Sequence, residues 1–256
     1  MPSPDSKNRF SSRVENYVKY RPGYPPGVVE TLRSACGLNK NSVVADIGSG
    51  TGLLARVFLA AGCQVIGVEP NAEMRAAGER LLADYPRFTS RDGSAEATGL
   101  EEGSVDFAAA GQAFHWFDPN KARMEFRRIL KPQGWAVLVW NQRLTEGSPF
   151  LHAYEALLQS YATDYNQVNH RNVEESSDTI PAFFGGPYHT ARFDNAQFFD
   201  FDGVRGRLLS SSYAPEPGHP NHAPMLAELR RIFDRYQEDG LVTFAYETHL
   251  YYGRIG

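Results

Sequence analysis

Two acidic residues and a glycine-rich turn are the groups in this sequence best suited to chemistry. Asp46 ends an apolar run, and Gly48, Gly50 and Gly52 follow it in the stretch GSGTG. A glycine turn before a helix lets a ligand approach the backbone and offers it free N–H groups. A carboxylate at Asp46 repels a pyrophosphate but suits an ammonium group. Glu69 ends the next apolar run and can accept hydrogen bonds from both hydroxyls of a ribose. The pattern predicts a ligand that contains a ribose and an amino acid.

The spacing of the glycines argues against other ligands of such turns. The dinucleotide fingerprint G-x-G-x-x-G requires a last glycine where this chain has Leu53. A phosphate-binding loop requires a Lys-Ser or Lys-Thr pair, and none follows the glycines. A nicotinamide-dependent oxidoreductase therefore stays as the less favoured alternative. A protein that binds the cofactor without turnover also stays open.

Strands alternate with helices around these residues. The apolar runs SVVADIG and CQVIGVEP each precede a segment with a helical apolar stripe, and Asn71 is placed to cap the second helix. Short strands follow at 88–91, 105–110 and 135–140, with a helix opened by Asp118 and Pro119 before the last of them. Five strands with intervening helices predict a doubly wound, Rossmann-like α/β sheet with its ligand at the carboxyl ends of the strands.

Composition narrows the function further. The chain has 256 residues, 42% hydrophobic and 22% charged, with a net charge of −4. Nucleic acids and anionic membranes demand a basic face, so we expect neither partner and favour a small-molecule substrate. Cys36 and Cys63 lack zinc spacing, and we expect no metal. Without a signal core or a membrane span, the expected location is cytoplasmic.

With these residues the sequence resembles a known family, the class I S-adenosylmethionine-dependent methyltransferases. Within that family it resembles the small-molecule group that includes trans-aconitate methyltransferase. The resemblance covers residues 9–143 and fades over the C-terminal third. Its motifs are RPGYP, VVADIGSGTG, VIGVEP, GSAE, VDFAAAGQAFHWFD and RRILKPQGWAVLVWN. It implies a seven-stranded, mostly parallel sheet whose last strand is antiparallel, and S-adenosylmethionine as the cofactor.

The resemblance also implies a set of cofactor-binding residues. The methionine part would lie at Asp46 and the glycines, and the ribose at Glu69. Residues after the third and fourth strands would flank the adenine and the methionine end, respectively: Ala95 and Glu96, then Gln112 and Ala113. An N-terminal lid would meet the cofactor carboxylate through Arg21, with Tyr17 or Tyr20 beside it.

The sequence gives fewer indications of the residues that bind the methyl acceptor. His115 is a candidate general base because its ordinary pKa lies near neutrality, and plain packing is its alternative. Tyr24, Trp116 and Trp140 are candidate aromatic walls of a substrate pocket. The stretch GQAF lacks the Asn/Asp-Pro-Pro-Tyr motif of enzymes that methylate base or amide nitrogens. The acceptor atom therefore stays open among oxygen, carbon and nitrogen.

Three regions follow from this reading. Residues 1–40 are expected to form a helical N-terminal lid, and 41–145 the cofactor-binding core. Residues 146–256 are expected to hold a helical insertion and the last two strands, in the stretches TARFDNAQFFDFD and VTFAYETHLYYG. This last region belongs either to the same domain or to a substrate cap.

Overall fold

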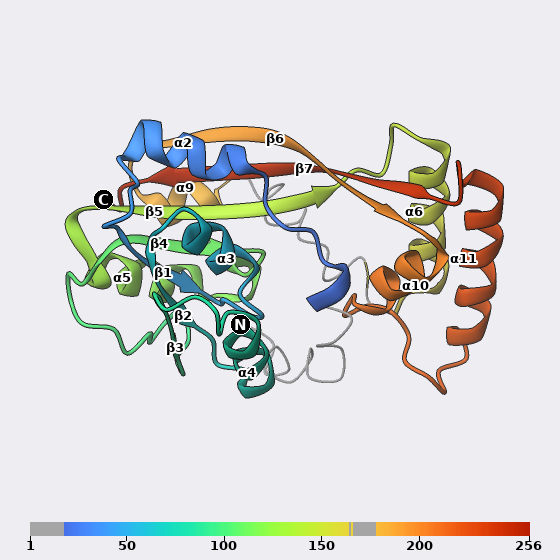
Figure 1. Cartoon of the computed structure of the whole chain (residues 1–256), viewed down its shortest axis with the longest axis horizontal. Helices are drawn as coiled ribbons and strands as arrows, with labels where there is room; N and C mark the ends of the chain where they lie inside the picture. Colours follow the sequence, from blue (N-terminus) through green and yellow to red (C-terminus); the bar gives the residue numbers. More distant parts are fainter. Residues whose placement is uncertain (1–17, 164, 166–177) are drawn as a thin grey trace.

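The computed structural model describes residues 18–163, 165 and 178–256, and Tyr17 lies outside them. Its centre is one seven-stranded sheet with the strand order β3-β2-β1-β4-β5-β7-β6 (Figure 1). The strands are β1 (Val43–Ile47), β2 (Gln64–Val68), β3 (Phe88–Arg91), β4 (Val105–Gly111), β5 (Leu130–Arg143), β6 (Tyr188–Phe199) and β7 (Val242–Gly253).

The first five strands are parallel, and β7 runs antiparallel between β5 and β6. This confirms the expected fold class. The chain moves outward from β1 to β3 and then returns to β4 on the other side of β1. The loops after β1 and β4 therefore diverge and leave a crevice, which is where open α/β sheets bind ligands.

Helices cover both faces of the sheet. They are α2 (Pro26–Cys36), α3 (Leu53–Ala60), α4 (Ala72–Leu81), α5 (Pro119–Ile129) and α9 (Thr179–Phe184), with the short 3-10 helix η2 (Phe114–Trp116). The helices α2 and α3 pack on one face, and α5 and α9 on the other. Side chains of β4 alternate between the two cores, because successive residues of a strand point to opposite faces. A strand that is buried on both faces has a nearly continuous apolar sequence.

Side-chain caps fix where the helices begin. The Asn71 side chain accepts hydrogen bonds from the backbone N–H groups of Glu73 (3.0 Å) and Met74 (2.9 Å) at the start of α4. Asp118 caps α5 in the same way, through the N–H groups of Asn120 and Lys121. Both starts are those that the sequence predicts. Each satisfies N–H groups that otherwise have no partner in the first helical turn.

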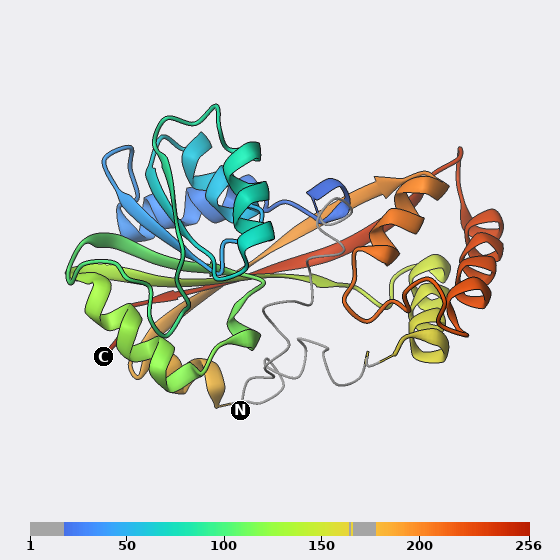
Figure 2. The ribbon, with the colours of Figure 1, turned by 90° about the horizontal axis from the view of Figure 1, so that it is seen from below.

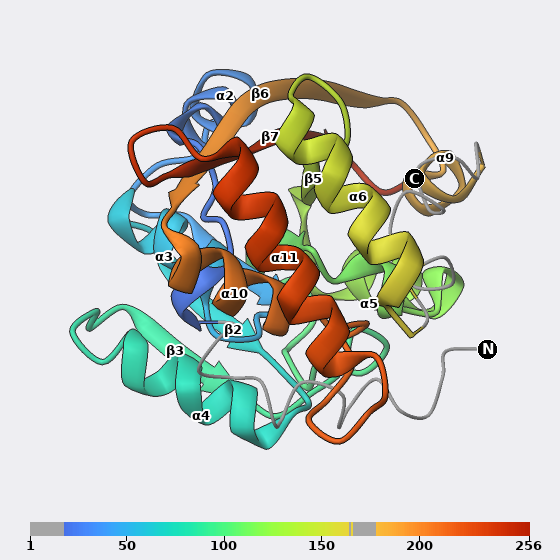
Figure 3. The same cartoon turned by 90° about the vertical axis from the view of Figure 1, so that its right-hand side faces the viewer.

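A second group of helices lies beyond one end of the sheet (Figures 1 and 3). We call α6 (Pro149–Tyr161), α10 (Phe201–Leu209) and α11 (His222–Tyr236) the helical cap. The cap has its own apolar core, which includes Leu157, Leu208, Leu229 and Phe244. The twelve-residue strands β6 and β7 reach from the sheet into this core and connect the two parts. Within the ranges that the structure describes, no helix is long and apolar enough to cross a membrane.

Candidate functional site at the carboxyl ends of the parallel strands

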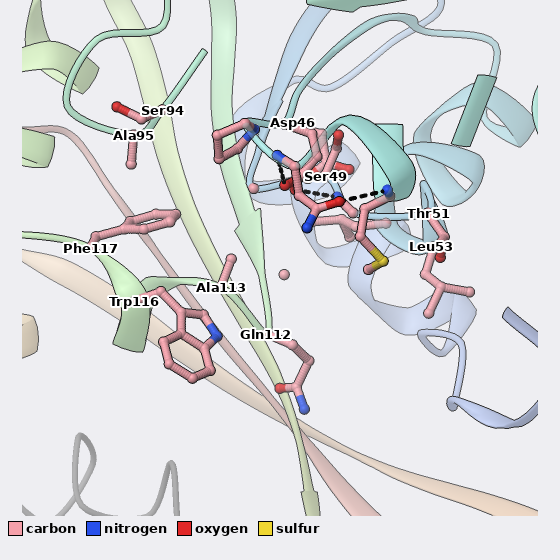
Figure 4. A pocket seen from close by; sticks show the side chains of 18 of the residues that line it. Asp46, Ser49, Thr51, Leu53, Ser94, Ala95, Gln112, Ala113, Trp116 and Phe117 are labelled. Carbon is pink, nitrogen blue, oxygen red and sulfur yellow. Dashed lines mark hydrogen bonds between the residues drawn. The ribbon is translucent and has the colours of Figure 1, made fainter. Parts of the chain in front are cut away.

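A cavity of about 510 Å³ lies in the crevice between β1 and β4. Figure 4 shows side chains from the loops after β1, β3 and β4 around it. The structure brings eleven of the candidate residues to its wall: Arg21, Tyr24, Asp46, Gly48, Gly50, Glu69, Ala95, Glu96, Gln112, Ala113 and Trp116. Tyr20, Gly52, His115 and Trp140 are not part of this wall.

The glycine turn is dictated by backbone conformation and by close neighbours. Gly48, Gly50 and Gly52 all have positive φ, at 69°, 56° and 85°. Such φ values strain other L-residues. A Cβ atom at Gly48 would lie 2.7 Å from the Cβ of Ala113, across the crevice. Packing inside the protein therefore excludes side chains here, and the space beside the turn stays open as the cavity.

Asp46 carries an unsatisfied oxygen on the cavity wall. Its side chain is buried, and Oδ2 accepts a hydrogen bond from the Ala55 N–H at 2.9 Å. Oδ1 is also buried and has no partner among the described residues. Burial raises the pKa of Asp46 to about 7; the Ala55 N–H opposes the shift and the Glu69 charge adds to it. A cation beside Oδ1 would satisfy this oxygen and favour the ionised carboxylate.

Glu69 joins two of the loops that form the site. Its Oε2 accepts a hydrogen bond from the Gly50 N–H at 2.9 Å, and its Oε1 accepts one from the Asn71 N–H at 2.8 Å. Burial raises its pKa, while these two N–H donors lower it. Each carboxylate oxygen can accept a second hydrogen bond, so Glu69 can still bind a diol. The carboxylate thus orders the glycine turn and faces the cavity at the same time.

Thr51 is a site residue that sequence reasoning missed. It lines the cavity and is 3% exposed, and its Oγ1 is buried without a partner among the described residues. A buried hydroxyl without a hydrogen bond is costly, so this atom indicates a polar ligand group. Its position between two glycines of the GSGTG stretch was the available signal. Leu53 and Met74 line the same cavity and were also missed.

Gln112 holds the opposite side of the crevice in a strained conformation. Its φ is 54°, which is rare for a residue with a side chain. Its Oε1 accepts a hydrogen bond from the Asn141 N–H at 3.0 Å, and its Nε2 donates to the Asn141 carbonyl at 3.2 Å. The side-chain amide thus extends the pairing of β4 with β5 after the β4 backbone has turned away.

One carboxylate oxygen of Glu96 has a hydrogen-bond partner within the protein. Its Oε1 accepts a hydrogen bond from the Asp118 N–H at 2.9 Å, just before α5. This contact joins the loop after β3 to the start of that helix. Ala95 is buried beside it. The two residues form the floor of the cavity between β3 and α5.

Residues 20–24, here called the lead-in, contact both the cavity and the cap. Arg21 lines the cavity, and its Nη2 donates a hydrogen bond to the Ser210 carbonyl at 3.0 Å, just after α10. Tyr20 does not reach the cavity, because its ring packs against Gly206 of α10. The Asn141 side chain anchors the same lead-in by donating to the Gly23 carbonyl at 3.0 Å. The lead-in therefore contacts both the cavity and the cap.

Two predicted residues of the acceptor side lie elsewhere. Trp140 is 2% exposed and packs against Phe114 and Tyr251 in the core under α5 and α9. Trp140 therefore does not line this cavity, because the alternation of β5 turns its side chain to the other face. His115 lies beside the Trp116 ring, with 4.8 Å between ring centres, but is not on the cavity wall. Tyr24 and Trp116 are the predicted walls that the structure brings to the cavity.

Comparison with known proteins places this site in context. A family profile described as a methyltransferase domain matches residues 45–138. An uncharacterized methyltransferase of Schizosaccharomyces pombe is 37% identical over 203 residues, which are 79% of this chain and 77% of the yeast protein. An uncharacterized methyltransferase of Mycobacterium tuberculosis is 37% identical over 139 residues, and this chain spans about half of it, 54%.

Solved structures share the fold. A structure from Anaeromyxobacter dehalogenans, provisionally named a type II methyltransferase, has a TM-score of 0.69 and 23% identity, with 92% of this chain and 98% of the other covered. The YcgJ protein of Bacillus subtilis has a TM-score of 0.55 and 18% identity, with 90% and 99% covered. Both alignments cover nine-tenths or more of this chain.

Proposed function

Because the chain belongs to the methyltransferase family, and S-adenosylmethionine is the family's cofactor, we propose that it methylates a small molecule. The observation that carries the proposal is the pair of acidic residues on one cavity wall. Asp46 has a buried oxygen without a partner, and Glu69 keeps acceptor capacity on both oxygens. The first suits the ammonium group of the methionine part, and the second suits the ribose hydroxyls.

The rest of the cavity fits the same ligand. Arg21 supplies a guanidinium for the cofactor carboxylate, and Thr51 supplies a buried hydroxyl. Ala95, Glu96 and Phe117 would border the adenine. Gly48, Gly50, Gln112 and Ala113 would surround the methionine end. We keep Gly52 as a residue that shapes the turn, because a Cβ there would lie 2.5 Å from Cδ1 of Leu82 in the protein interior.

When bound, S-adenosylmethionine would supply a methyl group on a positively charged sulfur for transfer to an acceptor atom that carries a lone pair. The chain's own residues contribute alignment. Gln112 and Ala113 fix one wall against Gly48, and Tyr24 and Trp116 supply aromatic surface. Alignment of this kind corresponds to effective molarities of about 10⁵ to 10⁸ M. The described residues on the cavity wall include no histidine, so the proposal assigns no general base.

The acceptor is proposed to bind between the cavity and the helical cap. The resemblance to the group that includes trans-aconitate methyltransferase supports a small molecule, and so does the chain's net charge of −4. We propose that the reaction takes place in the cytoplasm, which agrees with free thiols at Cys36 and Cys63. On this view residues 41–145 hold the cofactor, residues 18–40 cover it, and the helices of residues 146–256 enclose the acceptor.

A ligand panel tests the cofactor half. S-adenosylmethionine and S-adenosylhomocysteine should each raise the Tm of the protein, whereas NAD should not. Glu69→Gln should weaken S-adenosylhomocysteine binding about 10- to 100-fold, because it loses a charged acceptor for the ribose hydroxyls. Glu79→Gln, on the exposed face of α4, is the matched control. Equal binding by the wild-type protein and Glu69→Gln would refute the assigned site, and stabilisation by NAD alone would favour the oxidoreductase.

A turnover assay tests the enzyme half. Small molecules with hydroxyl, carboxyl or amine groups are screened by the release of S-adenosylhomocysteine in the presence of S-adenosylmethionine. Release that depends on the acceptor and disappears in Glu69→Gln supports the proposal. Tight cofactor binding with no turnover on any acceptor would favour the binding-only protein.

A further inference from the structure

A group of polar side chains is buried inside the helical cap. It combines Arg143 at the end of β5, Tyr154 of α6, Arg207 of α10 and Tyr246 of β7. All four are at most 9% exposed. They come from four different elements, so the tertiary structure assembles this group where the cap helices meet β7.

The two arginines of this group differ in their partners. Arg143 forms an ion pair with Glu155. Arg207 donates from Nε to the Tyr246 hydroxyl and from Nη1 to the Ser211 hydroxyl, both at 3.1 Å. No carboxylate of the described residues pairs with Arg207. These two bonds use two of the five N–H groups of its guanidinium, and the remaining three include both on Nη2.

Tyr154 adds a second polar group that lacks a hydrogen-bond partner among the described residues. Its hydroxyl is buried and has no partner among the described residues. The Arg143 guanidinium lies over its ring, 5.1 Å from the ring centre. Burial raises the pKa of Tyr154, and the positive charges of Arg207 and Arg143 act against this shift. The Tyr154 side chain therefore lies within the electrostatic reach of both guanidinium groups.

A buried guanidinium without an anion is unusual. Removing a charge from water costs several kcal/mol unless an ion pair and hydrogen bonds compensate it. Arg143 has the Glu155 carboxylate as a partner, whereas Arg207 has two hydroxyl partners and no carboxylate among the described residues. A hydrophobic side chain of similar volume would avoid this cost. An arginine at position 207 is therefore explained best by an anionic ligand.

The position of α10 connects this group to the cofactor site. Arg21 lines the cavity and donates to the carbonyl of Ser210, three residues after Arg207. The Tyr20 ring packs on Gly206, the residue before Arg207. Figures 1 and 2 show α10 beside the start of the described lead-in, on the side of the cap that faces the sheet. Arg207 is thus connected to the cofactor cavity through Tyr20 and Arg21, which contact its neighbours in the chain.

We propose that Arg207 and Tyr154 bind a carboxylate group of the methyl acceptor, which carries its nucleophilic atom elsewhere. This inference rests on the proposed function. A carboxylate carries one negative charge and so matches the one positive charge of Arg207, whereas a phosphate dianion exceeds it. The two oxygens of a carboxylate also match the fork of guanidinium N–H donors. An oxygen held by Arg207 is a poor nucleophile, so the acceptor has an anionic anchor and a separate atom that receives the methyl group.

The experiment uses the full chain saturated with S-adenosylhomocysteine. The probes are acetate, short hydroxy acids and the three hydroxybenzoates, each paired with its neutral amide, together with inorganic phosphate. Affinity is measured by isothermal titration. We expect at least one acid to bind at least 10-fold more tightly than its amide and more tightly than phosphate. No preference for any acid over its amide overturns the proposal, and a preference for phosphate overturns the assignment of a carboxylate.

Variants separate recognition from folding. Arg207→Met should abolish the preference for the acid and leave the Tm unchanged or up to about 4 °C higher, because it removes an uncompensated buried charge. Arg207→Lys should restore part of the preference, and Tyr154→Phe should weaken acid binding about 3- to 10-fold. Arg231→Met, on the exposed face of α11, is the control and should behave as wild type. A full acid preference in Arg207→Met, or a fall of more than about 10 °C in its Tm, assigns Arg207 a purely structural role and overturns the proposal.

Failure of the proposed function gives a different result. S-adenosylhomocysteine binding is measured first, without any acid. Its absence refutes the cofactor site, and the acids are then titrated into the free protein. Acid preference that depends on Arg207 there still supports an anion site in the cap, and its absence overturns that site independently.

Discussion

The parallel half of the sheet and the helical cap both bury charged side chains, but they hold them in different ways. In the parallel half, backbone N–H groups hold Asp46 and Glu69. In the cap, side chains surround Arg143 and Arg207: a carboxylate, tyrosine hydroxyls and a serine. The signs of the charges are also opposite. The first region holds buried negative charge, which in the proposed function receives a cation and a diol, and the second is built around positive charge.

The difference separates a site whose hydrogen-bond donors are positioned by the fold from one whose partners depend on individual side chains. Backbone donors at strand ends are positioned by the sheet, so any chain with this topology presents them. Side-chain partners depend on which helices meet, and each can change without altering the sheet. We therefore expect substitutions in the first region to change mainly ligand affinity and pH dependence. Breaking the buried Arg143–Glu155 ion pair of the second region should change mainly stability.

Breaking the ion pair of the cap should have the largest effect. Arg143→Met leaves the half-buried carboxylate of Glu155 without its cation. We expect a loss of about 3–5 kcal/mol in the free energy of unfolding, measured by urea denaturation. Lys121→Met, at an exposed ion pair on α5, should change it by less than about 1 kcal/mol. A loss below 1 kcal/mol in Arg143→Met would show that the cap does not depend on this pair.

Asp46 should give the parallel half a stability that falls as the pH rises. Its pKa is about 7 when folded, against an ordinary value of 3.8. The ligand-free protein then loses stability between about pH 4 and pH 7, because the unfolded chain ionises first. Relative to Asp46→Asn, this loss should be on the order of 3 kcal/mol between pH 4.5 and 8. Parallel pH profiles for the two proteins would contradict the burial argument.

Cofactor binding should show the opposite trend with pH at the same residue. An ammonium group beside Asp46 requires the ionised carboxylate, so the Kd of S-adenosylhomocysteine should fall about 10-fold per unit from pH 5 to pH 7. Above the pKa of about 7 it should level off. Asp46→Asn should bind more weakly and without this slope. Isothermal titration at five pH values checks the prediction, and an unchanged slope in the variant would assign it to another group.

Substitution of Thr51 should have the smallest effect, and it tests whether the parallel half of the sheet responds in ligand affinity rather than in stability. Thr51→Val removes a buried hydroxyl that has no partner among the described residues. The stability of the ligand-free protein should stay within about 1 kcal/mol, while S-adenosylhomocysteine binds about 3- to 10-fold more weakly. Ser104→Val, at an exposed turn, should change neither. Unaltered cofactor binding in Thr51→Val would leave its hydroxyl outside the ligand site.

The fold was largely predictable because its signals are local. The apolar runs of β1, β2 and β4 and the caps at Asn71 and Asp118 all appear in the sequence and are confirmed. The helix α9 was not predicted, because six residues are too few to show a helical period. Strand β5 begins at Leu130, five residues before the predicted start, because its partner β4 extends the pairing.

The site was predictable only where topology brings residues together. Asp46 and Glu69 end neighbouring strands, so their meeting followed from strand order. The position of Trp140 away from the cavity was not predictable, because alternation along β5 defines two faces without saying which face a ligand occupies. Arg207 gave no signal, since a lone arginine in a short helix looks like a solvated charge. Its burial depends on Tyr246 and Ser211, which are distant in sequence or lie outside its helix.

The long pairing of β6 with β7 bears on how enzymes of this architecture diversify. The cap joins the sheet where β5 ends and α6 follows, where β6 passes into α10, and where α11 returns to β7. All three junctions lie at one end of the ladder, near the Phe199–Val242 pair, and the Tyr188–Gly253 pair closes the other end. Cap helices can therefore lengthen, shorten or be exchanged without shifting strand register at the glycine turn. If the cap binds the acceptor as proposed, a lineage can inherit the methyl donor unchanged while its choice of acceptor evolves as a separable module.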